Sequence, residues 1–294
     1  MCEIGTIHLS MLFFSYYCNN QQTLKQLFYI HAEHSDEATD RTLSMRIGER
    51  HYSYAITGKT GLDLYSLAYY SNEEMTGDAL SKIYSDHEEL HHSFHEVQVS
   101  YDHPGSVLVP LPFYDAEAAK SVLSIMYGNI IGSSVISEPL NEWQIYNIYA
   151  VPNDVHDWVS RVFPSYKYRH NYTLAVGRLP ADPADHILVD FTTDEFSFIV
   201  IKEGKLQIAQ TLSYSSPEDI LYHLLKACNQ FSLSRGEIQL YISGLIEKES
   251  QLFRELYQYF LYTEFREPAW NVPDGNGYPA HFFTSLNDLA QCAS

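Results

Sequence analysis

The chain has 294 residues, of which 45% are hydrophobic, enough to build one large core or two ordinary ones. Its 18 basic and 37 acidic side chains leave a formal charge of -19, which repels phosphate backbones and anionic lipids, so we expect neither a nucleic acid nor a membrane as partner. The cysteines Cys2, Cys18, Cys228 and Cys292 show no close pairing or metal-ligand spacing, as is typical of a reducing compartment, and we expect a cytoplasmic protein.

Residues 1–40 are expected to form a peripheral N-terminal extension, because polar and acidic stretches dominate their second half. From residue 41 onward, apolar spacing and turn residues predict the element order βββαβαβ. In chain order these strands and helices are expected at 43–47, 52–57, 62–70, 73–94, near Val97 or Val107, 115–127 and 144–149. A further helix at 153–163 and a neck at 164–170 follow, so we expect a first domain at 41–165.

The same pattern recurs without a gap 144 residues later, where Ile187–Tyr214 repeats Leu43–Tyr70. A repeat of this length indicates a second folding unit of domain size. After a loop at 177–185, its elements are expected at 187–189, 196–200, 206–214, 217–228, 238–242, 247–259 and 261–265. We therefore expect a second domain at 166–294, whose C-terminal helix packs back on the first domain.

Three hairpin-linked strands followed by a helix, a strand, a helix and a strand, present twice, resemble the actin, Hsp70 and sugar-kinase ATPases. The hairpin at 187–206 is most similar to the phosphate-binding hairpin of pilus-assembly and secretion proteins of that fold. Residues 41–294 as a whole resemble a Bacteroidetes family of unknown function with an actin-like ATPase fold. The resemblance implies two ribonuclease H-like α/β domains, each a mixed five-stranded sheet with flanking helices, and ATP with Mg²⁺ as the cofactors to test.

In active members of this superfamily, each hairpin begins with an aspartate that holds Mg²⁺ through water, followed by glycines whose N–H groups approach the phosphates. This chain departs from that pattern in both hairpins. Arg46 lies opposite Asp190 in the repeat, and threonines replace glycines after Asp190. The residues that correspond to the nucleotide-binding positions are Asp190, Thr192, Thr193, Gly244, Gly48 and Arg46.

Two interpretations of Asp190 follow from this comparison. It either positions Mg²⁺, with the hydroxyls of Thr192 and Thr193 near a phosphate, or it caps a turn or pairs with a cation such as Arg46. The incomplete phosphate-contacting elements favour the second interpretation. We therefore expect a degenerate nucleotide site in a binding or scaffold module, with a protein partner or a second copy of the chain as ligand. The alternative is a working ATPase or ATP-driven switch that uses the interdomain cleft.

His87-Glu88-Glu89-Leu90-His91 matches the H-E-x-x-H pattern, which on a helix presents two imidazoles for zinc and a glutamate as general base. A zinc hydrolase at His87 and His91 is thus a remote alternative function. Phe94 occupies the position where the longer motif needs glycine. We expect instead a solvated, histidine-rich helix end on the outside of a sheet.

Overall fold

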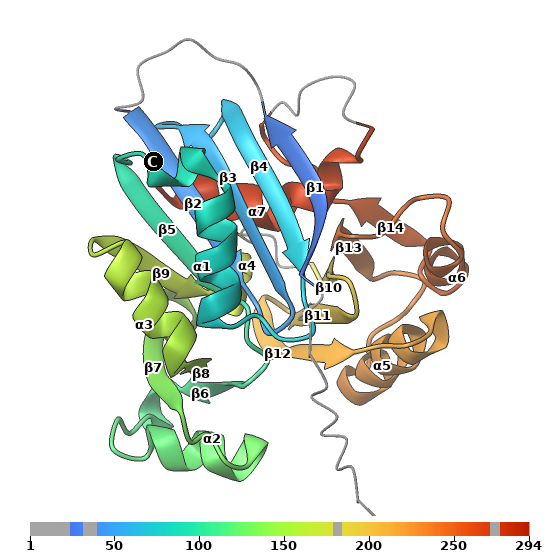
Figure 1. The fold of residues 1–294 in the computed structure, drawn as a ribbon. Coiled ribbons are helices and arrows are strands. Elements are labelled where there is room, and N and C mark those ends of the chain that lie inside the picture. Colours follow the sequence, from blue (N-terminus) through green and yellow to red (C-terminus); the bar gives the residue numbers. More distant parts are fainter. Residues whose placement is uncertain (1–23, 32–39, 179–183, 271–276, 294) are drawn as a thin grey trace, which may run out of the picture.

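The computed structural model describes residues 24–31, 40–178, 184–270 and 277–293, and it contains two mixed sheets with helices around them (Figure 1). Of the expected N-terminal extension, 1–23 and 32–39 lie outside the described residues. Residues Lys25–His31 form strand β1, which pairs antiparallel with the first sheet. No helix in the described parts of the chain is long and apolar enough to cross a membrane.

The first sheet has six strands in the order β1-β4-β3-β2-β5-β9. The four strands β1, β4, β3 and β2 are antiparallel to their neighbours, and β5 and β9 then run parallel to β2. Helices α1 and α3 cover one face, burying Leu80, Ile83 and Trp158 against the sheet. The bounds of these elements are β2 Arg41–Ile47, β3 His51–Gly58, β4 Leu64–Ser71, α1 Gly77–Asp86, β5 Glu96–Tyr101, α3 Asn153–Val162 and β9 Tyr166–His170.

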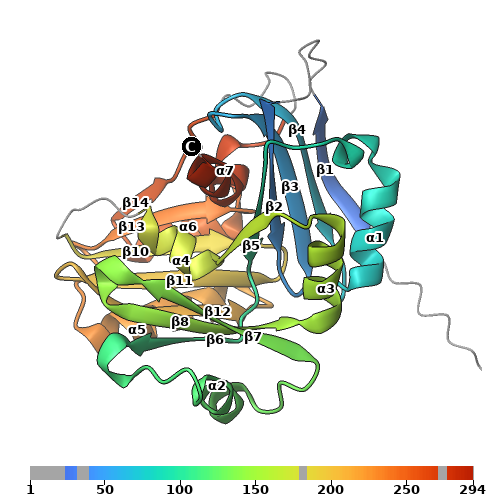
Figure 2. The same cartoon turned by 90° about the vertical axis from the view of Figure 1, so that its left-hand side faces the viewer.

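A small subdomain is inserted between β5 and α3 and projects from the first sheet (Figure 2). Its three strands have the order β6-β8-β7, and α2 packs Leu123 against Ile148 of this sheet. The bounds are β6 Ser106–Pro110, α2 Ala119–Tyr127, β7 Ser133–Leu140 and β8 Ile145–Pro152.

This insertion corrects two sequence-based expectations. The strand expected at 144–149 exists as β8, but it belongs to the small sheet. The expected neck at 164–170 contains β9, which pairs with β5 as the last strand of the first sheet, so the expected border at 165/166 falls just before a strand of the first sheet. The reason is that periodicity locates a strand but does not reveal which sheet it joins. Val97 and Val107 likewise mark two strands, in different sheets.

The helix expected at 73–94 is also shorter, since α1 ends at Asp86 and a 3₁₀ turn, η2, covers Glu88–His91. Residue His87 between them is extended, with its ring turned toward the sheet. That side chain is buried, so the expectation of a solvated helix end is wrong at this position.

The second sheet has the predicted order of elements and the strand order β12-β11-β10-β13-β14, which matches β4-β3-β2-β5-β9 of the first sheet. Its helix α5 begins at Pro217, and the Asp219 side chain accepts from the N–H of Ser216, as the capping residues predict. The bounds are β10 His186–Phe191, β11 Glu195–Lys202, β12 Lys205–Ser213, α5 Pro217–Phe231, β13 Gln239–Gly244, α6 Gln251–Tyr259 and β14 Tyr262–Phe265.

The C-terminal helix α7, Thr284–Ala290, lies between the two sheets (Figure 2). Leu286 and Phe283 pack on Ala55 and Leu67 of the first sheet, while Ser285 faces the second. The remaining short elements are α4 Asn171–Gly177, η3 Leu111–Phe113, η4 Asn141–Trp143, η5 Ala280–Phe283 and η6 Gln291–Ala293. Helix α7 thus places side chains beside the central strands of both sheets.

Candidate functional site

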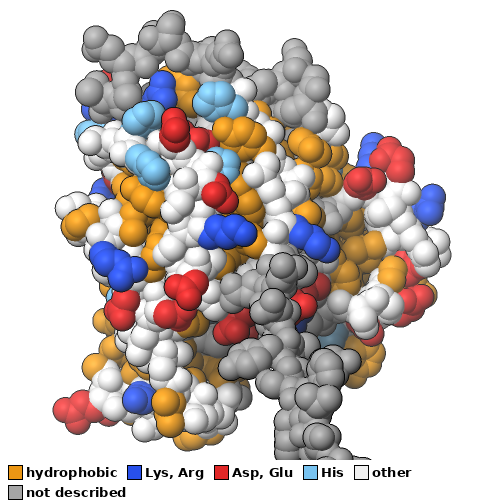
Figure 3. Space-filling model, viewed as in Figure 1, with side chains coloured by type: hydrophobic (Ala, Val, Ile, Leu, Met, Phe, Trp, Pro, Cys, Tyr) orange, Lys and Arg blue, Asp and Glu red, His pale blue; other side chains and the backbone are white. Residues whose placement is uncertain are grey.

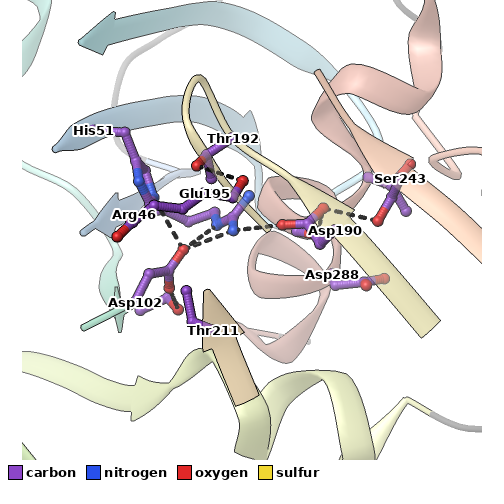
Figure 4. A network of polar contacts seen from close by, with 12 residues as sticks. Arg46, His51, Asp102, Asp190, Thr192, Glu195, Thr211, Ser243 and Asp288 are labelled. Atoms are coloured by element: carbon purple, nitrogen blue, oxygen red, sulfur yellow. Dashed lines mark hydrogen bonds and ion pairs between the residues drawn. The ribbon is translucent and has the colours of Figure 1, made fainter. Parts of the chain in front are cut away.

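The ends of β2 and β10 face each other, and there Arg46 contacts Asp190 (Figure 4). The two residues are 144 positions apart and occupy equivalent places in their strands. Arg46 pairs with Ser53 across its hairpin, as Asp190 pairs with Ser197. The Arg46 Nη2 group donates to Asp190 Oδ2 at 2.8 Å.

A second carboxylate, Asp102, holds the other side of the guanidinium. Arg46 Nε donates to Asp102 Oδ2 at 2.8 Å, and the same oxygen lies 3.2 Å from His51 Nε2. Ser100 Oγ donates to the other oxygen of Asp102 at 2.6 Å. Burial opposes the charge on Arg46, but Asp102 and Asp190 outweigh it and raise the pKa of Arg46 above its ordinary value. Burial likewise opposes the charge on Asp102, but Arg46 and His51 outweigh it and lower the pKa of Asp102.

Donors from three separate elements surround the Asp190 carboxylate. Besides Arg46 on β2, its Oδ1 accepts from Ser243 Oγ on β13 at 2.8 Å and from Ser285 Oγ on α7 at 2.7 Å. The side chain is only 12% exposed. These contacts engage both oxygens that a hydrated Mg²⁺ would use.

The space beside Gly48 is filled by the protein itself. A Cβ atom placed on Gly48 would lie 2.2 Å from the ring of His51, so the imidazole already packs on the glycine backbone. The N–H of Gly48 donates to the carbonyl of His51 at 2.9 Å, which closes the hairpin. Glycine is therefore needed here for the hairpin's own packing.

The two threonines after Asp190 lie in different surroundings. Thr192 is buried, and its N–H and hydroxyl both donate to the carbonyl of Glu195, at 2.9 and 3.0 Å. Thr193 is exposed at the tip of the turn. The Thr192 hydroxyl is thus used in a hydrogen bond within its own hairpin. Of the two threonines, Thr193 is the one on the surface.

Gly244 stands where β13 passes close to the end of β10. Its φ is +85°, and an added Cβ would lie 2.1 Å from the carbonyl oxygen of Phe191. The following N–H, of Leu245, donates to that same oxygen at 2.9 Å. Contact between backbones accounts for this glycine without a ligand.

A second ion pair joins the hairpins at the same offset as the first. Arg50 Nη1 donates to Asp194 Oδ2, and these residues are again 144 positions apart. Their side chains are 45% and 37% exposed, so this pair lies at the exposed rim of the contact between the two hairpins. Alignment of the two repeat copies at the 144-residue offset places Arg46 opposite Asp190 and Arg50 opposite Asp194. This pairing of opposite charges is the sequence signal that could have revealed Arg50. No local pattern marks Asp102, His51 or Ser285, which sequence reasoning missed.

The histidines of the H-E-x-x-H pattern have separate partners. His87 lies against the first sheet, with Nδ1 2.9 Å from Tyr54 Oη and 3.0 Å from Glu89 Oε1 and with Nε2 in contact with Tyr70 Oη. His91 Nε2 instead lies 2.8 Å from the carbonyl of Tyr84. Across the described ranges, no group of three or more His, Cys, Asp or Glu side chains is arranged to hold a metal ion.

Two buried histidines, His103 and His170, should make the free energy of unfolding depend on pH. Burial lowers the pKa of His103 and of His170 to about 4, from an unfolded value of about 6.5. Between these limits the unfolded chain binds more protons, so stability falls as the pH drops from 6.5 to 4, by up to about 1.4 kcal/mol per pH unit for each histidine.

Urea unfolding at several pH values in this window measures that slope. His170→Gln should reduce it, whereas His92→Gln, at an exposed site, should leave it unchanged. Equal slopes in the wild type and His170→Gln would contradict the assignment.

The fold and site can now be compared with known proteins. A family model described as "protein of unknown function (DUF3822)" matches residues 31–262. The chain belongs to the DUF3822 family. No curated protein matches its sequence. The family assignment confirms the resemblance to a family of unknown function.

Two solved structures place this DUF3822 protein in the actin-like ATPase fold. One is a Bacteroides thetaiotaomicron protein of actin-like ATPase fold and unknown function, with 17% identity and a TM-score of 0.71 over 87% of this chain and 97% of that chain. The other is the PilM-PilN type IV pilus biogenesis complex, with 15% identity and a TM-score of 0.60 over 86% and 98%. Identities this low establish the fold alone.

Proposed function

We propose that this DUF3822 protein is a binding or scaffold module that works without nucleotide, its former phosphate site closed by its own side chains. The observation that carries the proposal is the buried ion pair between Arg46 and Asp190, where the ends of β2 and β10 meet. In the superfamily this aspartate is expected to face Mg²⁺. Here a guanidinium takes the place of the cation.

Admitting Mg²⁺ and ATP would require this pair to separate. Arg46 and Asp102 are almost fully buried, so moving Arg46 away from Asp190 would leave a buried carboxylate without its counter-charge. The two glycines leave no space for phosphate contacts that could offset this cost. The His51 ring fills the space beside Gly48, and the Phe191 backbone fills the space beside Gly244. Opening the site therefore carries a free-energy cost that contacts with a ligand would have to offset.

The ligand of such a module is proposed to be another protein or a second copy of the chain. PilM, which has a similar fold, is found in a complex with PilN, which supports a protein-binding role for this architecture. Cys228 and Cys292 are free thiols, which fits the reducing cytoplasm. The strong negative charge argues against a nucleic acid or an anionic membrane as partner.

A thermal shift assay with Mg²⁺-ATP tests the proposal. A ligand at one hundred times its Kd stabilises a folded protein by about 2.7 kcal/mol, so binding would raise the melting temperature clearly. We expect no rise with millimolar Mg²⁺-ATP, and no ATP hydrolysis above that of a buffer blank.

The competing ATPase interpretation makes the opposite prediction. It requires a rise that Asp190→Asn abolishes and that the rim variant Asp194→Asn retains, since only Asp190 lies at the expected metal position. Such a result would overturn the closed-site proposal.

A further inference from the structure

A pocket lies where the inserted subdomain meets the first sheet, and the Arg46–Asp190 pair does not line it. It has a volume of about 200 Å³ and opens between the β2–β3 turn, the starts of α1 and α3, and the small sheet. Small-molecule sites usually measure roughly 300–1,000 Å³, so this pocket is suited to one side chain rather than a nucleotide. Its walls include Met75, Pro104 and Pro152.

Acidic side chains line this pocket. They are Glu49, Glu74 and Asp154. Asp154 Oδ2 accepts from the N–H of Gly77 at 2.9 Å, so it mainly caps α1, while the Glu49 and Glu74 side chains are exposed. In Figure 3, acidic side chains gather around the end of α1 that lies next to α3. The positive dipole ends of α1 and α3 offset only part of these charges.

The imidazole of His103 supplies an independent indication of a ligand. Its side chain is 5% exposed and lines the same pocket, yet its Nε2 has no hydrogen-bond partner among the residues that the structure describes. A buried polar atom without a partner is costly, so it marks a place where a ligand group would be stabilising. Because burial lowers the pKa of His103 to about 4, the ring is neutral near pH 7 and offers an acceptor nitrogen.

We propose that this pocket, lined by Glu49, Glu74 and His103, binds an arginine or lysine side chain presented by a basic segment of a partner protein. The carboxylates attract the cation, the neutral ring accepts an N–H donor, and the apolar walls pack on the aliphatic stem. The charge of -19 complements a basic partner. This inference names a partner chemistry for the proposed binding role and rests on it.

Titration of the full chain with a blocked pentapeptide, one arginine between alanines, tests this site at 0.15 M salt. The readout is the ring resonance of His103 in ¹H–¹⁵N NMR, assigned by its loss in His103→Gln, together with the amide of Gly105, which also lines the pocket. We expect saturable shifts at both positions. The matching peptide with neutral citrulline should bind at least about fivefold more weakly.

Charge-matched variants separate a specific site from general attraction to an acidic protein. Glu49→Gln with Glu74→Gln should weaken binding at least about fivefold, whereas Glu247→Gln with Glu249→Gln, exposed in the second domain, should not. Equal losses in both double variants, no saturable shift, or tighter binding of free spermidine than of the peptide would overturn the proposal. None of these outcomes depends on the Mg²⁺-ATP experiment, so the two proposals can fail separately.

Discussion

Arg46→Ala should lower the free energy of unfolding by about 3–5 kcal/mol, because it leaves two carboxylates facing each other without their cation. Asp102 and Asp190 both bind the guanidinium, and the Arg46 side chain is only 5% exposed. Urea unfolding near pH 7 measures the loss. Adding Asp190→Asn to Arg46→Ala should recover part of it, because one of the uncompensated charges is then removed.

Arg50→Ala is the matched control, since Arg50 pairs with Asp194 at the same offset but at the rim. An exposed pair contributes about 0–1 kcal/mol, so this variant should remain close to the wild type. Similar losses in the two variants would mean that burial of the central pair does not decide its energetics.

The elements from β10 to β14 follow the sequence-based expectations because they are contiguous in the chain. Its helix α5 starts at Pro217 with acidic residues in its first turn, and strands β10 and β11 keep the hairpin register of β2 and β3. The strands of the first sheet are interrupted between β5 and β9 by a subdomain at 106–152. Periodicity identified β8 as a strand, but only pairing between distant segments assigns it to the small sheet and makes β9 the partner of β5.

The candidate site was predictable only where the repeat itself carried information. The 144-residue offset places Arg46 opposite Asp190, and the structure brings their side chains into contact. Asp102 joins that pair from 56 residues away, and Ser285 reaches Asp190 from 95 residues away. Such contacts depend on how α7 and β5 pack beside β2 and β10, which no local pattern encodes.

Two ion pairs connect the β2–β3 hairpin to the β10–β11 hairpin. Here Arg46–Asp190 and Arg50–Asp194 connect the same hairpins directly, the first in the interior and the second at the rim. Helix α7 adds a further link, since it packs on the first sheet while Ser285 donates to Asp190. Side chains of the protein thereby join the two sheets at three places.

Gly244→Ala should reduce the free energy of unfolding by about 2–5 kcal/mol. The left-handed backbone conformation costs an alanine about 1–2 kcal/mol, and overlap with a packed backbone costs about 1–3 kcal/mol more. The overlap arises because the new methyl group would lie 2.1 Å from the carbonyl oxygen of Phe191, whose position β10 fixes. Urea unfolding without any ligand measures the effect.

Gly204→Ala provides the control for backbone strain alone. Gly204 has a φ of +68° but no atom within 4 Å of an added Cβ, so its loss should be limited to about 1–2 kcal/mol. A glycine kept for contact with a nucleotide could be replaced at little cost to the stability of the ligand-free protein. If Gly244→Ala and Gly204→Ala reduce the free energy of unfolding equally, close packing against Phe191 is not the reason for glycine at position 244. The proposal that the protein's own backbone fills this part of the site would then be weakened.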